Sequence, residues 1–262
     1  MSIVASSIAT AILDAGLHGS TKRRGSEGGN MKKKYELTEE TKILAEDIVL
    51  HRVRAVRDFM LSDGTKVKAG ELGGWIEKED NLSQGGSAWV GDDAEVCGSA
   101  KVENDAWVGG KAFVCDQALI YDNARIYGDA LVYDNAEVYG KAEVYGKARV
   151  FGNARVSGEA HIYEEVHVSG CTEVCGNAQI KSINDYVVFK NAWSSGRWFT
   201  YTSSNKMWKV GCFYGTGKEL IAKAYSDSEL SGRCYEVVVR AQEAVDKAIE
   251  KAKRVSNKGD MK

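Results

Sequence analysis

A six-residue repeat runs without interruption through the middle of the chain, from Gly85 to Ile180. Its sixth position is Val or Ile in all sixteen units, and its fourth position is Ala except at Val166 and Thr172. Gly, Asp, Asn and Lys are common at the two positions before the Ala. Self-similarity at a fixed period is the signature of a repeat architecture, so all sixteen units are expected to share one local structure.

The repeat predicts a short strand and a corner in every unit. Ala and Val are two positions apart, so both point to one face of the strand and the residue between them points to the other. Gly and Asx residues tolerate the positive φ that a tight corner needs. Three strands and three corners close one triangular coil, and each residue then stacks on the residue three units later, at the usual strand spacing of ~4.8 Å. Small Ala and β-branched Val fill the narrow interior of this coil.

Hexads of this form resemble the left-handed β-helix class of hexapeptide-repeat proteins, which includes many acyltransferases and some non-catalytic proteins. The handedness comes from this resemblance, because periodicity alone does not fix it. The fold class that we expect is therefore mainly β: a left-handed parallel β-helix with an N-terminal β cap and a C-terminal α+β module.

The flanking segments differ from the repeat in composition, and a solenoid needs caps on its exposed strand edges. Residues 1–30 are polar and glycine-rich towards their end and are expected to form a disordered extension. Residues 31–84 are expected to form the N-terminal cap, with a short helix running into a strand over Thr41–Val49 and a hairpin around Ser62–Gly64. The β-helix itself should span 85–180. Residues 181–262 should hold a strand at Tyr186–Phe189, a hairpin over Trp193–Phe213, and helices over Lys218–Ser226 and Tyr235–Arg254.

Aromatic residues follow the Val or Ile in many units, at the corners of the coil. Stacking three units apart places Tyr121 on Tyr139, Tyr127 on Tyr145, and Tyr133 on Phe151. One interpretation is that these rings shield the corner backbone. The other is that they form a subunit interface or a ligand groove. We assign them as candidate interface residues: Tyr121, Tyr127, Tyr133, Tyr139, Tyr145 and Phe151.

The predicted C-terminal hairpin combines anion-binding donors with flat aromatic surface, a mixture that suits nucleotide-like ligands. An ordinary amphipathic hairpin is the alternative. The candidate ligand-binding residues are Ser195, Arg197, Trp198, Thr200, Trp208 and Lys209.

The last predicted helix carries a narrow apolar seam at alternating spacings of three and four residues. It can pack against its own hairpin or bundle with copies from other subunits. The second arrangement makes Val238 and Val245 interface residues and, with the class resemblance, predicts a homotrimer.

The sequence holds little that points to catalysis. Hexapeptide-repeat acyltransferases resemble this chain and typically use a histidine base near the contact between two prisms, which makes His161 and His167 the alternative catalytic residues. They occupy outward positions on neighbouring faces, however, and no loop interrupts the hexads to build an acceptor site. A general base also needs an orienting partner within hydrogen-bond reach. Glu165 or Glu173 could serve as this partner, but nothing in the sequence singles out either, so non-catalytic binding is the leading interpretation.

Other classes of function receive no support from composition or motifs. Six cysteines include no CxxC pair, which leaves no predicted metal site. The formal net charge of −2 gives no direct nucleic-acid signature. We expect no cofactor, no membrane association and a location in the host bacterial cytoplasm with reduced thiols.

The whole of Met31–Arg254 resembles uncharacterised β-helix proteins carried by enterobacterial phages and prophages. Besides the hexads, this similarity is carried by Arg52–Phe59, Gly70–Glu77, Asn191–Arg197, Trp208–Gly217 and the pair Ser231–Gly232. The resemblance implies a phage-type accessory protein for host takeover or counter-defence, which binds a host protein or sequesters a nucleotide-like signal. The alternatives are a coenzyme A-dependent acyltransferase of the hexapeptide-repeat class and a structural or assembly protein.

Overall fold

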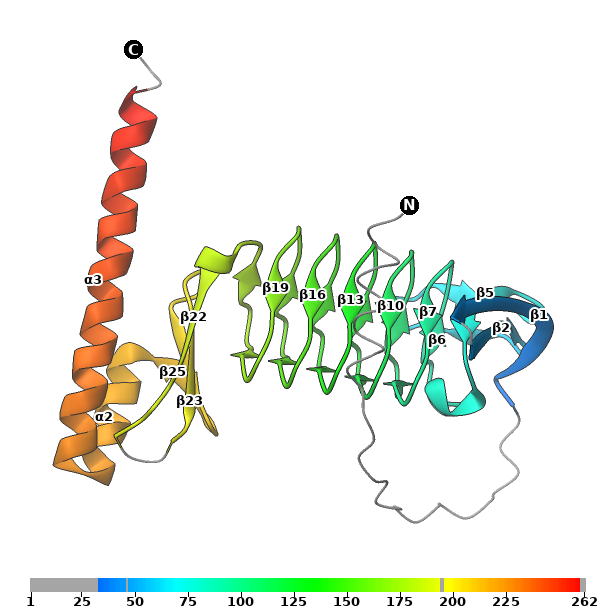
Figure 1. Cartoon of the computed structure of the whole chain (residues 1–262), viewed down its shortest axis with the longest axis horizontal. Coiled ribbons are helices and arrows are strands. Elements are labelled where there is room, and N and C mark those ends of the chain that lie inside the picture. Colours follow the sequence, from blue (N-terminus) through cyan, green and yellow to red (C-terminus); the bar gives the residue numbers. More distant parts are fainter. Residues whose placement is uncertain (1–32, 46, 194–195, 260–262) are drawn as a thin grey trace.

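A β-solenoid forms the body of the molecule, as the computed structural model in Figure 1 shows. The structure describes residues 33–45, 47–193 and 196–259. An N-terminal group of antiparallel strands lies at one end of the solenoid, and a β-sheet with two helices lies at the other. The expectation for residues 1–30 falls outside the described residues.

The N-terminal segment is built from strands and one short helix. These are β1 (Tyr35–Ala45), β2 (Ile48–Ala55), β3 (Phe59–Met60), β4 (Lys66–Val67), β5 (Leu72–Ile76) and the 3-10 helix η1 (Glu79–Asn81).

The solenoid contributes one two-residue strand for each hexad. The strands are β6 (Trp89–Val90), β7 (Glu95–Val96), β8 (Lys101–Val102), β9 (Trp107–Val108), β10 (Phe113–Val114), β11 (Leu119–Ile120), β12 (Arg125–Ile126), β13 (Leu131–Val132), β14 (Glu137–Val138), β15 (Glu143–Val144), β16 (Arg149–Val150), β17 (Arg155–Val156), β18 (His161–Ile162), β19 (His167–Val168), β20 (Glu173–Val174) and β21 (Gln179–Ile180).

The C-terminal segment contains a four-stranded antiparallel sheet and two helices. Its elements are η2 (Ile183–Asp185), β22 (Tyr186–Lys190), β23 (Trp198–Thr202), β24 (Met207–Val210), β25 (Phe213–Thr216), α2 (Gly217–Asp227) and α3 (Glu229–Gly259). The predicted strand, hairpin and two helices are therefore present, and α3 begins earlier and ends later than the apolar pattern indicated.

Each solenoid strand pairs in parallel with the strand three hexads later, so that β10 lies between β7 and β13 and Phe113 is in register with Leu131. Three such stacks make the three faces. We call them face A, which ends with β10, β13, β16 and β19; face C, which runs from β8 to β20; and face D, which runs from β6 to β21. The Ala and Val residues of each hexad fill the interior, as predicted, and side chains such as those of Ala148 and Val150 have no exposed surface. Burying one Val side chain stabilises a fold by ~1.5–3 kcal/mol, so the fully buried interior is a large stabilising term.

The predicted helix at Thr41–Val49 is wrong, because most of this segment belongs to β1 and β2. The two strands pair antiparallel, with Tyr35 opposite Ala55, and β2 pairs in turn with β5. Since β5 pairs with β7, the hairpin extends face A of the solenoid beyond its first coil. Helix-favouring residues such as Glu and Lys are overridden here by pairing within a hairpin, in which Lys42 lies opposite Leu50.

The N-terminal end of the solenoid presents backbone carbonyls, and side-chain donors cap them. Lys34 has no exposed surface, and its Nζ donates to the carbonyls of Gly85, Gly86 and Ala88 at 3.2, 3.4 and 2.7 Å. Asn81 caps face C, since its Nδ2 donates to the carbonyls of Gly98 and Ala100 at 3.3 and 2.8 Å. An ammonium group and an amide therefore supply the donors that a preceding coil would have supplied.

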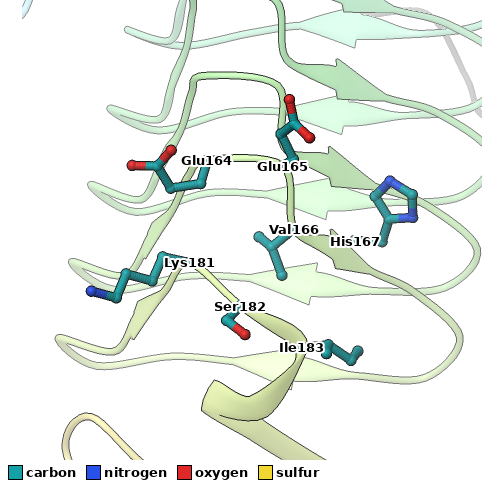
Figure 2. Close-up of a pocket in the computed structure, with 7 residues that line it drawn as sticks. All are labelled: Glu164, Glu165, Val166, His167, Lys181, Ser182 and Ile183. Carbon is teal, nitrogen blue, oxygen red and sulfur yellow. The ribbon is translucent and has the colours of Figure 1, made fainter.

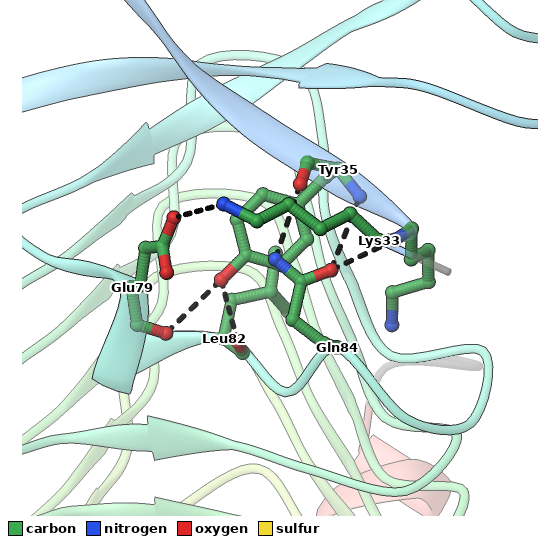
Figure 3. A network of polar contacts seen from close by, with 6 residues as sticks. Lys33, Tyr35, Glu79, Leu82 and Gln84 are labelled. Atoms are coloured by element: carbon green, nitrogen blue, oxygen red, sulfur yellow. Dashed lines mark hydrogen bonds and ion pairs between the residues drawn. The ribbon is translucent and has the colours of Figure 1, made fainter. Parts of the chain in front are cut away.

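Tyr35 and Gln84 fasten β1 to the start of the solenoid (Figure 3). The Tyr35 hydroxyl lies 2.6 Å from the Leu82 carbonyl and 3.0 Å from the Glu79 carbonyl. The Gln84 side chain accepts from the backbone N–H of Lys34 at 2.8 Å and donates to the Tyr35 carbonyl at 3.1 Å. These contacts join segments that are almost fifty residues apart in the sequence.

The opposite end presents backbone N–H groups, and hydroxyl groups of the C-terminal segment cap it. On face C the Thr200 Oγ1 accepts from the N–H of Glu173 at 3.1 Å, and on face D the Ser204 Oγ accepts from the N–H of Gln179 at 2.8 Å. On face A the cap is of a different kind, because the Tyr186 hydroxyl donates to a carbonyl, that of His167, at 2.8 Å.

Replacing Lys34 by Met is expected to remove a pH dependence of stability. Burial, and next the charge of Arg57, lower the pKa of Lys34 from 10.5 to about 8 in the folded protein. Between pH 8 and 10.5 the unfolded chain therefore binds more protons at this group, and the free energy of unfolding should rise with pH. Urea denaturation at pH values of about 7.5, 8.5 and 9.5, from just below this window to its middle, should show the rise in the natural protein and not in the Lys34→Met variant. Equal pH dependence in both proteins would contradict the assignment.

Alanine at Gly158 is expected to destabilise the fold more than alanine at Gly170. Both glycines have positive φ, 72° and 68°, so the conformational cost of alanine is similar. A Cβ at Gly158 would lie 2.8 Å from the backbone N of Gly176 in the next coil, whereas nothing lies within 4 Å at Gly170. Overpacking should cost Gly158→Ala ~1–3 kcal/mol more, as measured by urea denaturation. Equal losses would show that the coil spacing can adjust.

Candidate binding surfaces

The corner aromatics form continuous ladders along the solenoid axis. Tyr121 stacks on Tyr139 with ring centroids 4.9 Å apart and an interplanar angle of 5°. Tyr127 and Tyr145 stack at 4.9 Å and 2°, and Tyr163 continues this ladder at 5.2 Å. Each ring covers the face of the next ring, so the ladders turn ring edges outward and leave few faces for a ligand to stack on. This geometry fits the interpretation in which the rings shield the corners.

Hydroxyl groups tie the same rings to the outward residues of the next coil. The Tyr127 hydroxyl donates to Glu143 Oε2 at 2.8 Å, and the equivalent contact between Tyr121 and Glu137 measures 3.5 Å. Partial burial, and then the Glu143 carboxylate, raise the pKa of Tyr127 well above its ordinary value of 10. Both tyrosines therefore act as protonated donors at neutral pH. The assignment of the ladder residues, including Tyr133 and Phe151, to a subunit interface stays a prediction.

Several charged side chains on the solenoid surface are paired along the axis with partners one coil away. Arg155 contacts Glu137 at 2.8 Å on face C. At the corners Lys147 contacts Glu165 at 2.7 Å, and the matching pair Lys141–Glu159 lies at 3.2 Å. Exposed pairs of this kind add only ~0–1 kcal/mol each, but they occupy the charged groups that a ligand would use.

His161 and His167 lie on different faces, D and A, as the period predicted. His161 Nδ1 is 3.6 Å from Glu143 Oε2, a carboxylate that already accepts from Tyr127. His167 makes an edge contact with the Phe151 ring at 6.3 Å. Within the described residues, no group of three or more His, Cys, Asp or Glu side chains could hold a metal ion. The two histidines thus do not meet in one site: His161 lies beside the Glu143 carboxylate, and His167 lines a separate pocket with Glu165.

The predicted ligand cluster is divided between the two faces of the C-terminal sheet. Thr200 and Lys209 are paired across β23 and β24 on the side towards the solenoid, where Lys209 Nζ lies 3.3 Å from Glu173 Oε2. Trp208 lies on the other side and packs against α2 and α3 in a core that includes Phe199. Trp208 and Thr200 are each 2% exposed. The expectation of one binding surface is therefore wrong, because strand alternation separates these side chains and the fold buries two of them.

Arg197 and Trp198 are the remaining members of that cluster, and Ser195 lies outside the described residues. Trp198 is 40% exposed, and Lys190 Nζ lies 6.0 Å from the centroid of its ring. A cation beside an exposed ring is a common surface contact of modest energy and does not by itself define a ligand site.

A pocket of about 600 Å³ lies at the C-terminal end of the solenoid, next to β19. Figure 2 shows its lining, which is Glu164, Glu165, Val166, His167, Lys181, Ser182 and Ile183. Two features of the sequence mark the position of this pocket. Val166 breaks the rule of Ala at the fourth position, and the corner residue Glu164 adopts a φ of 61° where the other corners use Gly, Asp or Asn.

The apolar seam of α3 is largely exposed. Tyr235 and Val239 are the buried residues that hold the helix on the sheet. Two turns further along α3, on the side of the helix that faces the sheet, Asp246 accepts a hydrogen bond from the hydroxyl of Tyr201 in β23. Val238 contacts this core only partly, while Val245 is 50% exposed on a neighbouring side of the helix. Packing against the hairpin therefore uses mainly a different face, and Val245 on the seam is half-exposed.

Comparison with known proteins supports the solenoid. The family described as YdcK β-solenoid repeat matches residues 118–134, 124–140 and 148–164. The chain is accordingly a β-solenoid repeat protein with about six turns of eighteen residues. The matched segments include neither end of the chain. No curated protein matches this sequence.

Among the described residues, no helix combines the length and apolar character needed to cross a membrane.

Replacement of Trp208 by Ala is expected to act on folding. Since Trp208 is buried in the core between the sheet and the helices, the variant should lose ~3–5 kcal/mol of unfolding free energy. Trp198→Ala, at a half-exposed ring on the other side of the same sheet, should lose less than ~1 kcal/mol. Thermal denaturation followed by circular dichroism measures both losses. A stable Trp208→Ala protein would return this residue to the list of ligand candidates.

Proposed function

We propose that the protein is a non-catalytic binding protein that acts on a protein partner as a homotrimer. It would belong to the accessory proteins that phages and prophages use for host takeover or counter-defence, and would work in the host bacterial cytoplasm. The observation that carries this proposal is the exposed apolar seam of α3, a helix that stands away from the solenoid (Figure 1). The left-handed sense of the coil, implied by its hexads, forms part of the same proposal.

The seam supports association of α3 with copies of itself. Val238, Ala241, Val245, Ala248 and Ala252 follow one another at alternating spacings of three and four residues. This spacing keeps one narrow stripe facing a partner helix in a coiled coil, and Ala allows close approach of the backbones. Ion pairs within the helix, such as Arg240 with Glu236, supply charge on its other sides. A contiguous apolar stripe on a protein surface, unlike a single exposed side chain, supports a protein interface.

A protein partner fits the surface better than a small nucleotide-like signal does. The cluster proposed for such a ligand is divided between two faces of a sheet, and two of its members are buried. The coenzyme A-dependent acyltransferase and the structural particle are not favoured by any specific contact among the described residues. His161 and His167, which the first of these alternatives needs, point to separate faces.

Native mass spectrometry of the protein recovered from bacterial extract tests this proposal. We expect a homotrimer, and a partner protein bound in fixed stoichiometry supports the binding function. In the Val245→Asp variant a buried seam would gain a charge, and we expect the monomer mass. Lys247→Asp introduces the same residue two positions along the helix, outside the seam, and should leave the trimer intact. A monomer in the natural protein would overturn the proposed assembly, and a bound small molecule would favour sequestration instead.

A further inference from the structure

Face A of the solenoid ends on a strand edge that keeps free hydrogen-bond donors. In the preceding coil, the backbone N–H groups of Lys147 and Arg149 donate to the carbonyls of Glu164 and Val166, each at 2.8 Å. The N–H groups of Glu165 and His167 occupy the same hexad positions one coil later and must point in the same axial direction. No described residue accepts a hydrogen bond from either of them.

The C-terminal segment caps the other two faces but leaves this donor row open. Thr200 and Ser204 accept from the last strands of faces C and D, whereas Tyr186 donates to the His167 carbonyl on face A. The next coil would have stacked residues 182–185 here, but η2 replaces it. The pocket of about 600 Å³ lies at this step and is of the size that proteins use for ligands, ~300–1,000 Å³.

The charges at the step indicate what can stack there. Residues at the third hexad position along this corner alternate in sign: Asp93, Lys111, Asp129, Lys147 and Glu165. Lys147 contacts Glu165 at 2.7 Å from one side, and the next residue in the series is Ile183, which breaks the alternation. A basic side chain is therefore the complement that continues the series.

We propose that the edge of β19 binds an extended peptide segment of a partner protein by strand addition, with a Lys or Arg of that segment stacked on Glu165. Peptide carbonyls accept from the N–H groups of Glu165 and His167, and the segment runs parallel to β19. The His167 carbonyl stays with the Tyr186 hydroxyl, so the segment uses the donor row alone. Small or β-branched residues suit its inward positions, because Val166 and the end of the core lie beneath them. This inference specifies the partner chemistry of the proposed binding function and rests on it.

The chain itself provides the probe. Its hexad Tyr139–Val144, Tyr-Gly-Lys-Ala-Glu-Val, carries Lys at the third position and Glu at the fifth. On β19 these residues would meet Glu165 and His167, as Lys141 meets Glu159 and Glu143 meets His161 within the solenoid. A fluorescein-labelled peptide of this sequence can be titrated with the full-length protein and followed by fluorescence polarisation.

Saturable binding to the natural protein is the expected result. Glu165→Lys should weaken it by about tenfold, because like charges then face each other. Glu159→Lys is the matched control, because Glu159 holds the same hexad position at another corner and has a similar ion pair. This variant should bind the peptide as tightly as the natural protein does. A peptide with Glu in place of Lys should bind weakly to the natural protein and regain affinity for Glu165→Lys.

Amide hydrogen exchange in the same samples locates the peptide. The N–H groups of Glu165 and His167 should exchange more slowly with peptide bound, and those of Glu173 and Gln179, which are already capped, should not change. Absence of saturable binding, or equal loss in Glu165→Lys and Glu159→Lys, would overturn the proposal. The monomeric Val245→Asp variant should still bind the peptide, so failure of trimer assembly and failure of peptide binding can be told apart.

Discussion

Hydrogen bonds along the solenoid axis are the interaction on which the rest of the structure depends. At the corners and at the fifth hexad position they run from a backbone N–H to the carbonyl of a residue in the next coil, as from Arg149 to Val166. The return bond of each parallel strand pair runs the other way, so the first coil is left mainly with unpaired carbonyls and the last coil mainly with unpaired N–H groups. Unpaired backbone groups that are buried are costly, at ~1–3 kcal/mol each, and the two ends therefore need caps of opposite kind.

The two terminal segments meet this requirement with matching chemistry. At the first coil the donors come from the Lys34 ammonium and the Asn81 amide. At the last coil the acceptors on two faces come from the Thr200 and Ser204 hydroxyls. The caps are thus part of the solenoid's stability and not independent additions. The donor row on face A that this arrangement leaves uncapped is the strongest reason to look for a binding partner at that end.

The same axial stacking explains why the long sides of the solenoid carry so little chemistry. Side chains at equivalent positions are held about one strand spacing apart, so aromatic rings stack on each other and opposite charges pair, as with Glu137 and Arg155. Groups that might have served a ligand are satisfied by their own neighbours. At the ends and on α3 the repeat stops, and side chains there have no copy above or below them.

The sequence by itself determined the solenoid, its register and its interior, because this information is local and is repeated in every hexad. Val150 and Ala148 could be placed inside, and Tyr121 on Tyr139, from the period alone. Only the tertiary structure decided which segments meet: that β2 pairs with β5 and β5 with β7, which holds Thr41 and its neighbours in a strand, and that Trp208 is buried while Trp198 is exposed. Pairing partners across tens of residues, and the side of a sheet that receives a helix, leave no periodic trace in the chain. The uncapped edge at β19 was hidden from the sequence for the same reason, since it depends on where the C-terminal sheet comes to lie.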